Sequence, residues 1–205
     1  MIYDYITDNF REGEPIFFNE LPGKSRDYLR QEMKKLVDDG KLERLYNGVY
    51  FLPYITSDGK KGKISFDQFI EKKYLSNSGK SIGYITGVSL IKEYKLSIVD
   101  SSYYEVCSNE ASTKQRKKEI DGNMLVVYKP VVEISNKNKE ALQFLDLMTI
   151  IDKYCDLSDK SIRNKVKNIS LLSQVDFKMV KKYLSLYPDR VYRNLYELGF
   201  MKEIV

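Results

Sequence analysis

The dipeptide Asn47-Gly48 separates two runs of strand-forming residues, and it constrains the fold of the first part of the chain more than any other feature. An Asn-Gly pair between such runs is a strong signal for a tight β-hairpin, because both turn positions accept a positive φ angle. The flanking runs cover residues 41–46 and 49–52. We therefore predict a two-stranded hairpin that closes at Asn47-Gly48.

The residues before this hairpin have the periodicity of an amphipathic helix. Ser25 suits the N-cap position, because its side chain can accept a hydrogen bond from a free backbone N–H group. Gly40 suits the C-terminal stop. Leu29, Met33 and Leu36 recur at the spacing of one helical face. We therefore expect a helix between Ser25 and Gly40 that buries this face.

Upstream, the pattern predicts a helix over residues 2–10, a short strand at 16–18 and one helical turn after it. With the helix and hairpin that follow, this is the element order of a winged helix-turn-helix. We assign this domain to residues 1–55. Residues 56–63 contain three lysines, two glycines and a serine, which is typical of a flexible linker.

Residues 64–205 are expected to form a larger mixed domain that ends in helices. Apolar periodicity predicts helices and strands in alternation. The expected helices cover 66–75, 82–94, 138–155, 158–169, 176–187 and 191–198, and the expected strands cover 103–107, 124–128 and 131–134. The charged run at 114–118 is expected to be an exposed turn. The whole chain is thus predicted to be an α+β protein.

Several classes of enzyme are disfavoured by the composition. The chain has no histidine, which removes the commonest general base and metal ligand. Cys107 and Cys155 match no disulfide framework or metal spacing. Glu105, Asp121 and Glu133 are candidates for a nuclease centre, but Glu133 lacks the lysine expected two positions later. We predict no enzyme, no metal and no cofactor.

The ends and the hydropathy of the chain indicate its compartment. No apolar run approaches the roughly 20 residues that span a membrane. The N-terminus has neither the basic flank nor the apolar stretch of a signal peptide. We therefore expect a cytoplasmic protein with no membrane partner.

The charge distribution permits binding to a polyanion without proving it. The net charge is +5 and the pI is near 8.9. Residues 1–63 contain eleven Lys/Arg and eleven Asp/Glu, so this segment is neutral. A DNA-binding domain without net charge is expected to bind two DNA sites cooperatively, because a single copy would bind one site only weakly.

The exposed face of the helix before the hairpin would carry the contacts to DNA. The second helix of a helix-turn-helix lies in the major groove, and the wing reaches phosphates or the minor groove. By residue type, Gln31 suits an adenine edge and Arg30 a guanine. The predicted DNA-binding residues are Lys24, Ser25, Arg26, Arg30, Gln31, Lys34 and Lys35 on the helix and Arg44, Tyr46 and Asn47 on the hairpin. A solvated charged face or a protein-binding winged helix is the alternative interpretation.

A second basic cluster lies between residues 160 and 193, where nine Lys/Arg face only two acidic residues. Lys178, Lys181 and Lys182 are expected opposite an apolar helical stripe. We predict that these three lysines make auxiliary phosphate contacts, the alternative being the solvent side of a helix pair.

The stretch from Asn19 to Tyr50 resembles the N-terminal domain of the AbiEi family of antitoxins. Within it, the segment GKLERLYNGVYFLP is similar to the wing of that family. Residues 83–90 resemble the helix that opens the second domain of the family, and the strand pair at 106–109 and 126–130 fits the same pattern. The resemblance covers the chain to about residue 150.

This resemblance implies a bacterial antitoxin encoded beside a nucleotidyltransferase-like toxin. The winged helix would repress its own operon by binding inverted repeats in double-stranded promoter DNA, through Lys24 to Lys35 and Arg44 to Asn47. The second domain would carry the antitoxin activity. The alternatives are a stand-alone winged-helix regulator with a dimerising or ligand-sensing domain, a nucleic-acid enzyme, and a protein-binding module.

Overall fold

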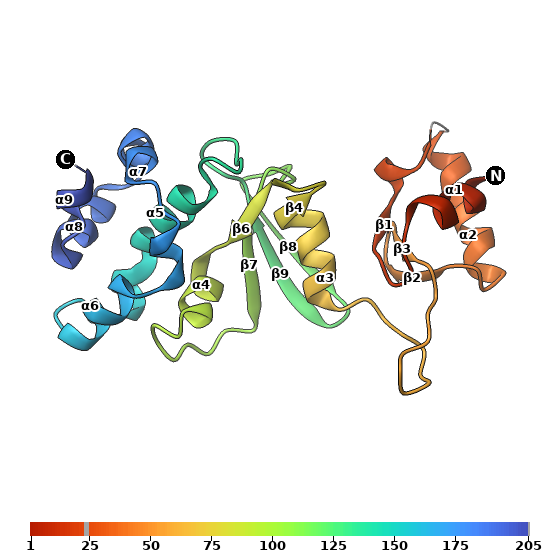
Figure 1. Cartoon of the computed structure of the whole chain (residues 1–205), viewed down its shortest axis with the longest axis horizontal. Helices are drawn as coiled ribbons and strands as arrows, with labels where there is room; N and C mark the ends of the chain where they lie inside the picture. The colour runs from red at the N-terminus through yellow and green to blue at the C-terminus, as the bar shows by residue number, and fades with distance from the viewer. Residues whose placement is uncertain (23–24, 205) are drawn as a thin grey trace. The chain divides into compact units, whose positions relative to one another are not determined.

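The computed structural model describes residues 1–22 and 25–204. The chain divides into two compact units, Met1–Lys72 and Lys73 to the C-terminus. Both units combine helices with a β-sheet, so the predicted α+β class is confirmed (Figure 1).

The first unit has the element order that the sequence predicts. As far as residue 51, its helices pack against a small sheet of short strands (Figure 1). The elements are α1 (Ile2–Asn9), β1 (Ile16–Phe17), the 3₁₀ turn η1 (Phe18–Glu20), α2 (Arg26–Asp38), β2 (Glu43–Tyr46) and β3 (Val49–Phe51). The strands form an antiparallel sheet in the order β1-β3-β2. The hairpin β2–β3 therefore leaves β2 at the edge of this sheet.

Helix α2 begins and packs as its sequence predicts. The Ser25 side chain accepts a hydrogen bond from the backbone N–H of Tyr28 and caps the helix. Leu29, Met33 and Leu36 are buried. They share one hydrophobic cluster with residues of α1, β1 and β3, so this single core fixes the helix against the sheet.

The turn of the hairpin differs from the expectation in one respect. Gly48 has a φ of 80°, but Asn47 does not have a positive φ. The strand pairing is shifted between Arg44 and Tyr46, which leaves Leu45 without a partner in the register. Such a bulge increases the local twist, and the hairpin closes with glycine alone in the left-handed region.

Residues 53–72 belong to the first unit, whereas the sequence analysis ended the first domain at residue 55 and began the second at 64. A closed loop follows β3, with hydrogen bonds from Gly62 N–H to the Tyr54 carbonyl and from the Tyr54 hydroxyl to the Lys63 carbonyl. Helix α3 (Phe66–Ile70) and the π-helical turn η2 (Glu71–Leu75) come next. Phe69 packs edge-to-face on Phe17, with ring centroids 6.2 Å apart.

The second unit is built on a four-stranded mixed sheet in the order β6-β7-β9-β8. The central pair β7–β9 is parallel, and the other two pairs are antiparallel. The strands are β6 (Gly83–Ile85), β7 (Tyr103–Ser108), β8 (Gln115–Ile120) and β9 (Asn123–Tyr128), and a small separate hairpin joins β4 (Ser76–Asn77) to β5 (Lys80–Ser81).

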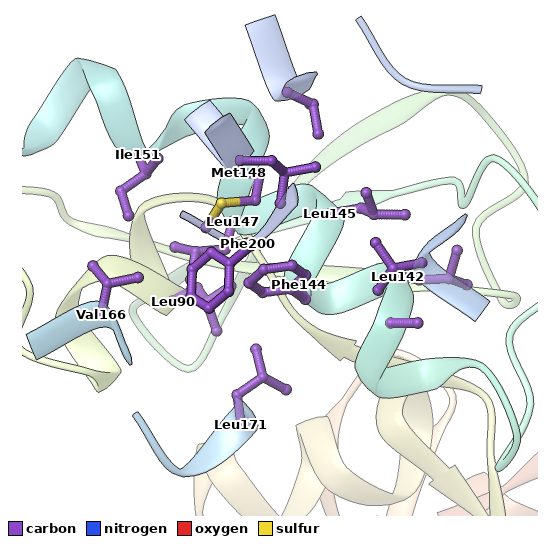
Figure 2. Packing of buried hydrophobic residues seen from close by; sticks show 14 of the residues in the cluster. Leu90, Leu142, Phe144, Leu145, Leu147, Met148, Ile151, Val166, Leu171 and Phe200 are labelled. Carbon is purple, nitrogen blue, oxygen red and sulfur yellow. The ribbon is translucent and has the colours of Figure 1, made fainter. Parts of the chain in front are cut away.

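The helices of this unit gather around α5, the long helix predicted from residue 138 (Figure 1). They are α4 (Gly87–Glu93), α5 (Lys139–Tyr154), α6 (Lys160–Lys167), η3 (Ser170–Ser173), α7 (Phe177–Tyr183), η4 (Leu184–Leu186), α8 (Asp189–Leu198) and α9 (Met201–Ile204). Helix α5 contacts α4, α7 and α8. Its side chains Phe144 and Met148 lie in the middle of the largest hydrophobic cluster (Figure 2).

Three elements of the second unit correct the sequence analysis. The first residues of the helix expected over 82–94 instead form strand β6 (Gly83–Ile85), and α4 begins only at Gly87. Gly83 explains this difference, because a Cβ atom there would lie 2.0 Å from the Tyr74 carbonyl oxygen and 2.6 Å from that of Cys107. Only glycine lets the backbone approach these neighbours so closely. The segment that resembles the family helix therefore opens as a strand.

The charged run at 114–118, expected as a turn, is largely edge strand β8. Most of its side chains are exposed, and lysine-rich edge strands are a common protection against unwanted strand pairing. Residues 131–134 are not a strand. There the Asn109 side chain makes two hydrogen bonds of 2.9 Å to the backbone of Ile134, so it satisfies the polar groups that a strand partner would have bonded.

No helix within the described part of the chain combines the length and the apolar character that crossing a membrane requires.

Candidate nucleic-acid interface

Helix α2 presents the predicted contact residues to solvent. Arg26, Arg30, Gln31, Lys34 and Lys35 are all exposed, and so is the capping residue Ser25. They are exposed because the opposite face of the helix is held in the core of the first unit. Lys24, also a predicted contact, lies outside the described residues.

The charge of this face is mixed. Helix α2 contains four Lys/Arg and three Asp/Glu, a net charge of +1. Arg30 forms an ion pair with Asp27 at 3.0 Å, between side chains that are 64% and 85% exposed. An exposed pair of this kind contributes at most about 1 kcal/mol. Arg30 can therefore exchange its carboxylate partner for a phosphate or a base edge at little cost.

The hairpin β2–β3 holds one arginine at its tip. The Arg44 guanidinium donates a hydrogen bond of 3.0 Å to the Asn47 side-chain oxygen and one of 3.4 Å to the Tyr46 carbonyl. Arg44 and Asn47 are exposed, whereas Tyr46 is half-buried. These contacts direct a fixed cation into solvent at the end of the hairpin.

Aromatic side chains pack against the tip of the hairpin β2–β3. A Cβ atom at Gly48 would lie 3.4 Å from the ring of Phe18. Phe18 packs edge-to-face on Tyr50, with ring centroids 5.5 Å apart. The hairpin is connected to α2 through a tight turn in which the N–H groups of Lys41 and Leu42 bond the Leu36 carbonyl. Helix and hairpin are thus parts of one packed unit, which is what a two-element reader of DNA requires.

The predicted auxiliary lysines lie in the second unit, on α7. Lys178, Lys181 and Lys182 are exposed, and Val180 between them is buried, so the expected apolar stripe is present. The Lys182 ammonium lies 5.2 Å from the centroid of the Tyr183 ring.

The three candidate nuclease carboxylates are not brought together. Both oxygens of Glu105 already accept hydrogen bonds, from the Tyr128 hydroxyl at 2.8 Å and the Val88 N–H at 2.5 Å. Asp121 precedes the start of β9 and Glu133 follows its end. Within residues 1–22 and 25–204, no group of three or more His, Cys, Asp or Glu side chains is placed to hold a metal ion.

One polar group in the core of the second unit was not predicted from the sequence. Asp146 lies on α5 among buried apolar residues, and burial raises the pKa of its carboxyl to about 6. The Thr86 hydroxyl donates a hydrogen bond of 2.7 Å to it, which lowers the pKa and limits the rise. An aspartate within the apolar run of a predicted buried helix was the available signal.

No protein-family model matches the chain, and no curated protein matches it significantly.

Proposed function

We propose that the first unit is a winged helix-turn-helix that binds double-stranded DNA. Helix α2 would be the recognition helix and the hairpin β2–β3 the wing. One observation supports this most strongly: α2 exposes four cations and Gln31, and the hairpin packed into the same core carries a fixed guanidinium at its tip. Cations near phosphates give affinity, and polar side chains at base edges give specificity.

Within this class, we propose an antitoxin-repressor of the AbiEi kind that acts in the bacterial cytoplasm. The support is the resemblance of residues 19–50 to the family's N-terminal domain. The protein would bind inverted repeats in its own promoter and neutralise a nucleotidyltransferase-like toxin encoded beside it. The chain itself would act by binding and not as an enzyme.

The DNA-binding proposal is tested by fluorescence anisotropy with a duplex from the promoter upstream of the gene. Arg26→Ala, Arg30→Ala and Arg44→Ala should each weaken binding. Loss of one phosphate contact should also reduce the slope of log K against log salt concentration by about 0.9. Arg11→Ala removes an exposed arginine from the same unit and serves as the matched control. If all four variants bound the duplex with the affinity of the unaltered chain, direct contact of α2 and the wing with DNA would be excluded.

The antitoxin proposal is tested by co-expression. The adjacent nucleotidyltransferase gene should arrest growth when it is expressed alone, and the full chain should restore growth. A chain that represses its promoter but does not restore growth would instead be a stand-alone regulator. That second candidate is favoured by the cavity of the second unit, whose polar lining suits a ligand.

A further inference from the structure

The second unit contains a cavity of about 510 Å³, within the range of small-molecule binding sites. Its lining comes from strands β6, β7 and β9, from α5 and from the segment after α7. The polar groups used below are Thr86, Glu105, Lys129, Asp146, Lys153 and Tyr187. All of them belong to the second unit, so the inference is independent of the proposed DNA binding.

Asp146 provides a carboxylate without a cationic partner in the wall of this cavity. Its neighbours are neutral: Thr86 donates a hydrogen bond to it, and the hydroxyls of Tyr84 and Tyr187 lie beside it. No Lys or Arg of the described chain forms an ion pair with Asp146. The second carboxylate in the lining, Glu105, is occupied by Tyr128 and Val88. Asp146 is therefore the acidic group with capacity for a ligand donor.

The hydroxyl of Tyr187 adds a buried polar group to the wall of the cavity. This residue is 92% buried and its hydroxyl lies beside the Asp146 carboxylate, but within the described residues that hydroxyl makes no hydrogen bond of good geometry. Leaving a buried hydroxyl unsatisfied costs about 1–3 kcal/mol. A ligand atom in the cavity would satisfy this hydroxyl.

Three lysines add positive charge to the cavity wall. Lys114, Lys129 and Lys153 line it and are exposed. None of the three forms an ion pair within residues 1–22 and 25–204. The Lys129 N–H donates a hydrogen bond of 3.1 Å to the Lys114 carbonyl, which holds the backbones of these two residues side by side. Unpaired ammonium groups of this kind favour an anionic ligand.

Two tyrosines and two prolines complete the lining. Tyr128, Tyr154, Pro130 and Pro188 all contribute to the wall. Aromatic faces favour stacked planar rings. The ligand that matches this lining combines a flat ring bearing N–H donors for Asp146 with an anionic group for the lysines.

We propose that this cavity binds a mononucleotide. Its base would lie against the tyrosine rings with an amino or imino group on Asp146, the Tyr187 hydroxyl would bond the base or the ribose, and its phosphate would meet Lys129 and Lys153. An aliphatic amino acid offers no flat ring, and inorganic phosphate offers no ring to lie against the tyrosines.

Isothermal titration calorimetry on the full chain tests this with AMP, GMP, CMP and UMP as probes. At least one of the four should bind saturably with a stoichiometry of one. Its nucleoside and inorganic phosphate should each bind at least about tenfold more weakly, since each lacks one of the two recognised groups. The proposal is overturned if none of the four binds at about 10 mM, or if the nucleoside binds as tightly as the nucleotide.

Variants locate the site. Asp146→Asn should weaken binding by about tenfold or more, as loss of a charge-assisted hydrogen bond does. Lys153→Ala should weaken binding of the nucleotide but not of the nucleoside. Lys202→Ala, an exposed lysine of α9 outside the cavity, is the matched control and should bind as the unaltered chain does.

Tyr187→Phe separates binding from folding. It keeps the shape of the ring and removes a hydroxyl that makes no hydrogen bond of good geometry, so the melting temperature of the free protein should change little. Affinity for the nucleotide should nevertheless fall severalfold. Unchanged affinity in both Tyr187→Phe and Lys153→Ala would overturn the proposal even if Asp146→Asn failed to fold.

Discussion

Replacing Asp146 by Asn should stabilise the second unit at neutral pH and have little effect near pH 4. Burial raises the pKa of this carboxyl from its ordinary value of 3.8 to about 6. The folded state therefore holds its proton more tightly than the unfolded state does. Stability from this group is fully present below pH 3.8 and is lost as the pH rises through 6.

The expected magnitude follows from the pKa difference. One pKa unit corresponds to about 1.4 kcal/mol, so a rise from 3.8 to about 6 corresponds to a loss of about 3 kcal/mol above pH 7. Asparagine cannot ionise and avoids this loss, although it keeps a similar shape and an acceptor for the Thr86 hydroxyl. The stability difference between variant and unaltered chain should therefore grow by about 2 kcal/mol between pH 4 and pH 7.

Urea unfolding followed by circular dichroism at several pH values measures this difference. The transition of the second unit should move, and that of the first unit should not. Burial also raises the pKa of Glu93, but that group is present in both proteins and cancels in the difference. Asp100→Asn removes an exposed carboxylate from the same unit and is the matched control. A difference that does not change with pH would refute the assignment of a buried carboxylate that has no cationic partner.

Three further substitutions test the packing. Ser25→Ala removes the cap of α2 and should cost about 1 kcal/mol in the unfolding free energy of the first unit; an unchanged urea midpoint would contradict the capping role. Phe144→Ala removes a fully buried ring that packs on Phe177 and Phe200, and it should cost about 3–5 kcal/mol in the second unit by the same assay. Gly83→Ala should lower the melting temperature of the second unit, because the added Cβ would lie 2.0 Å from the Tyr74 carbonyl oxygen; a melting temperature as high as that of the unaltered chain would show that β6 does not approach Tyr74 so closely.

Elements with a strong local signal were predicted well. The cap at Ser25, the buried face of α2 and the apolar run of α5 each reflect forces within a few turns of one helix. The hairpin was located at Asn47-Gly48 for the same reason, although its bulge at Leu45 was not foreseen. Exposure of the predicted contact residues on α2 follows directly from burial of the opposite face.

Features that depend on distant partners were missed. Strand β8 is exposed along most of its length, so it lacks the alternation that reveals a strand. Gly83 is required by the carbonyl groups of Tyr74 and Cys107, the second of which is far along the chain. Asp146 meets Thr86 sixty residues away. The periodicity of a short segment contains no information about such long-range pairings. The cavity could not be predicted from the sequence, because its walls are brought together by these pairings.

The hydrogen bond between Arg44 and Asn47 gives the hairpin tip an entropic advantage. An unconstrained arginine loses rotamer freedom when it binds a ligand. The Arg44 side chain is already restricted in the unbound protein by its hydrogen bond to Asn47, so it has less entropy to lose on binding. Asn47→Gly would suit the turn equally well and yet release the arginine. Asn47 thus contributes an acceptor atom, and its value lies in keeping a long flexible cation in one orientation before any partner arrives.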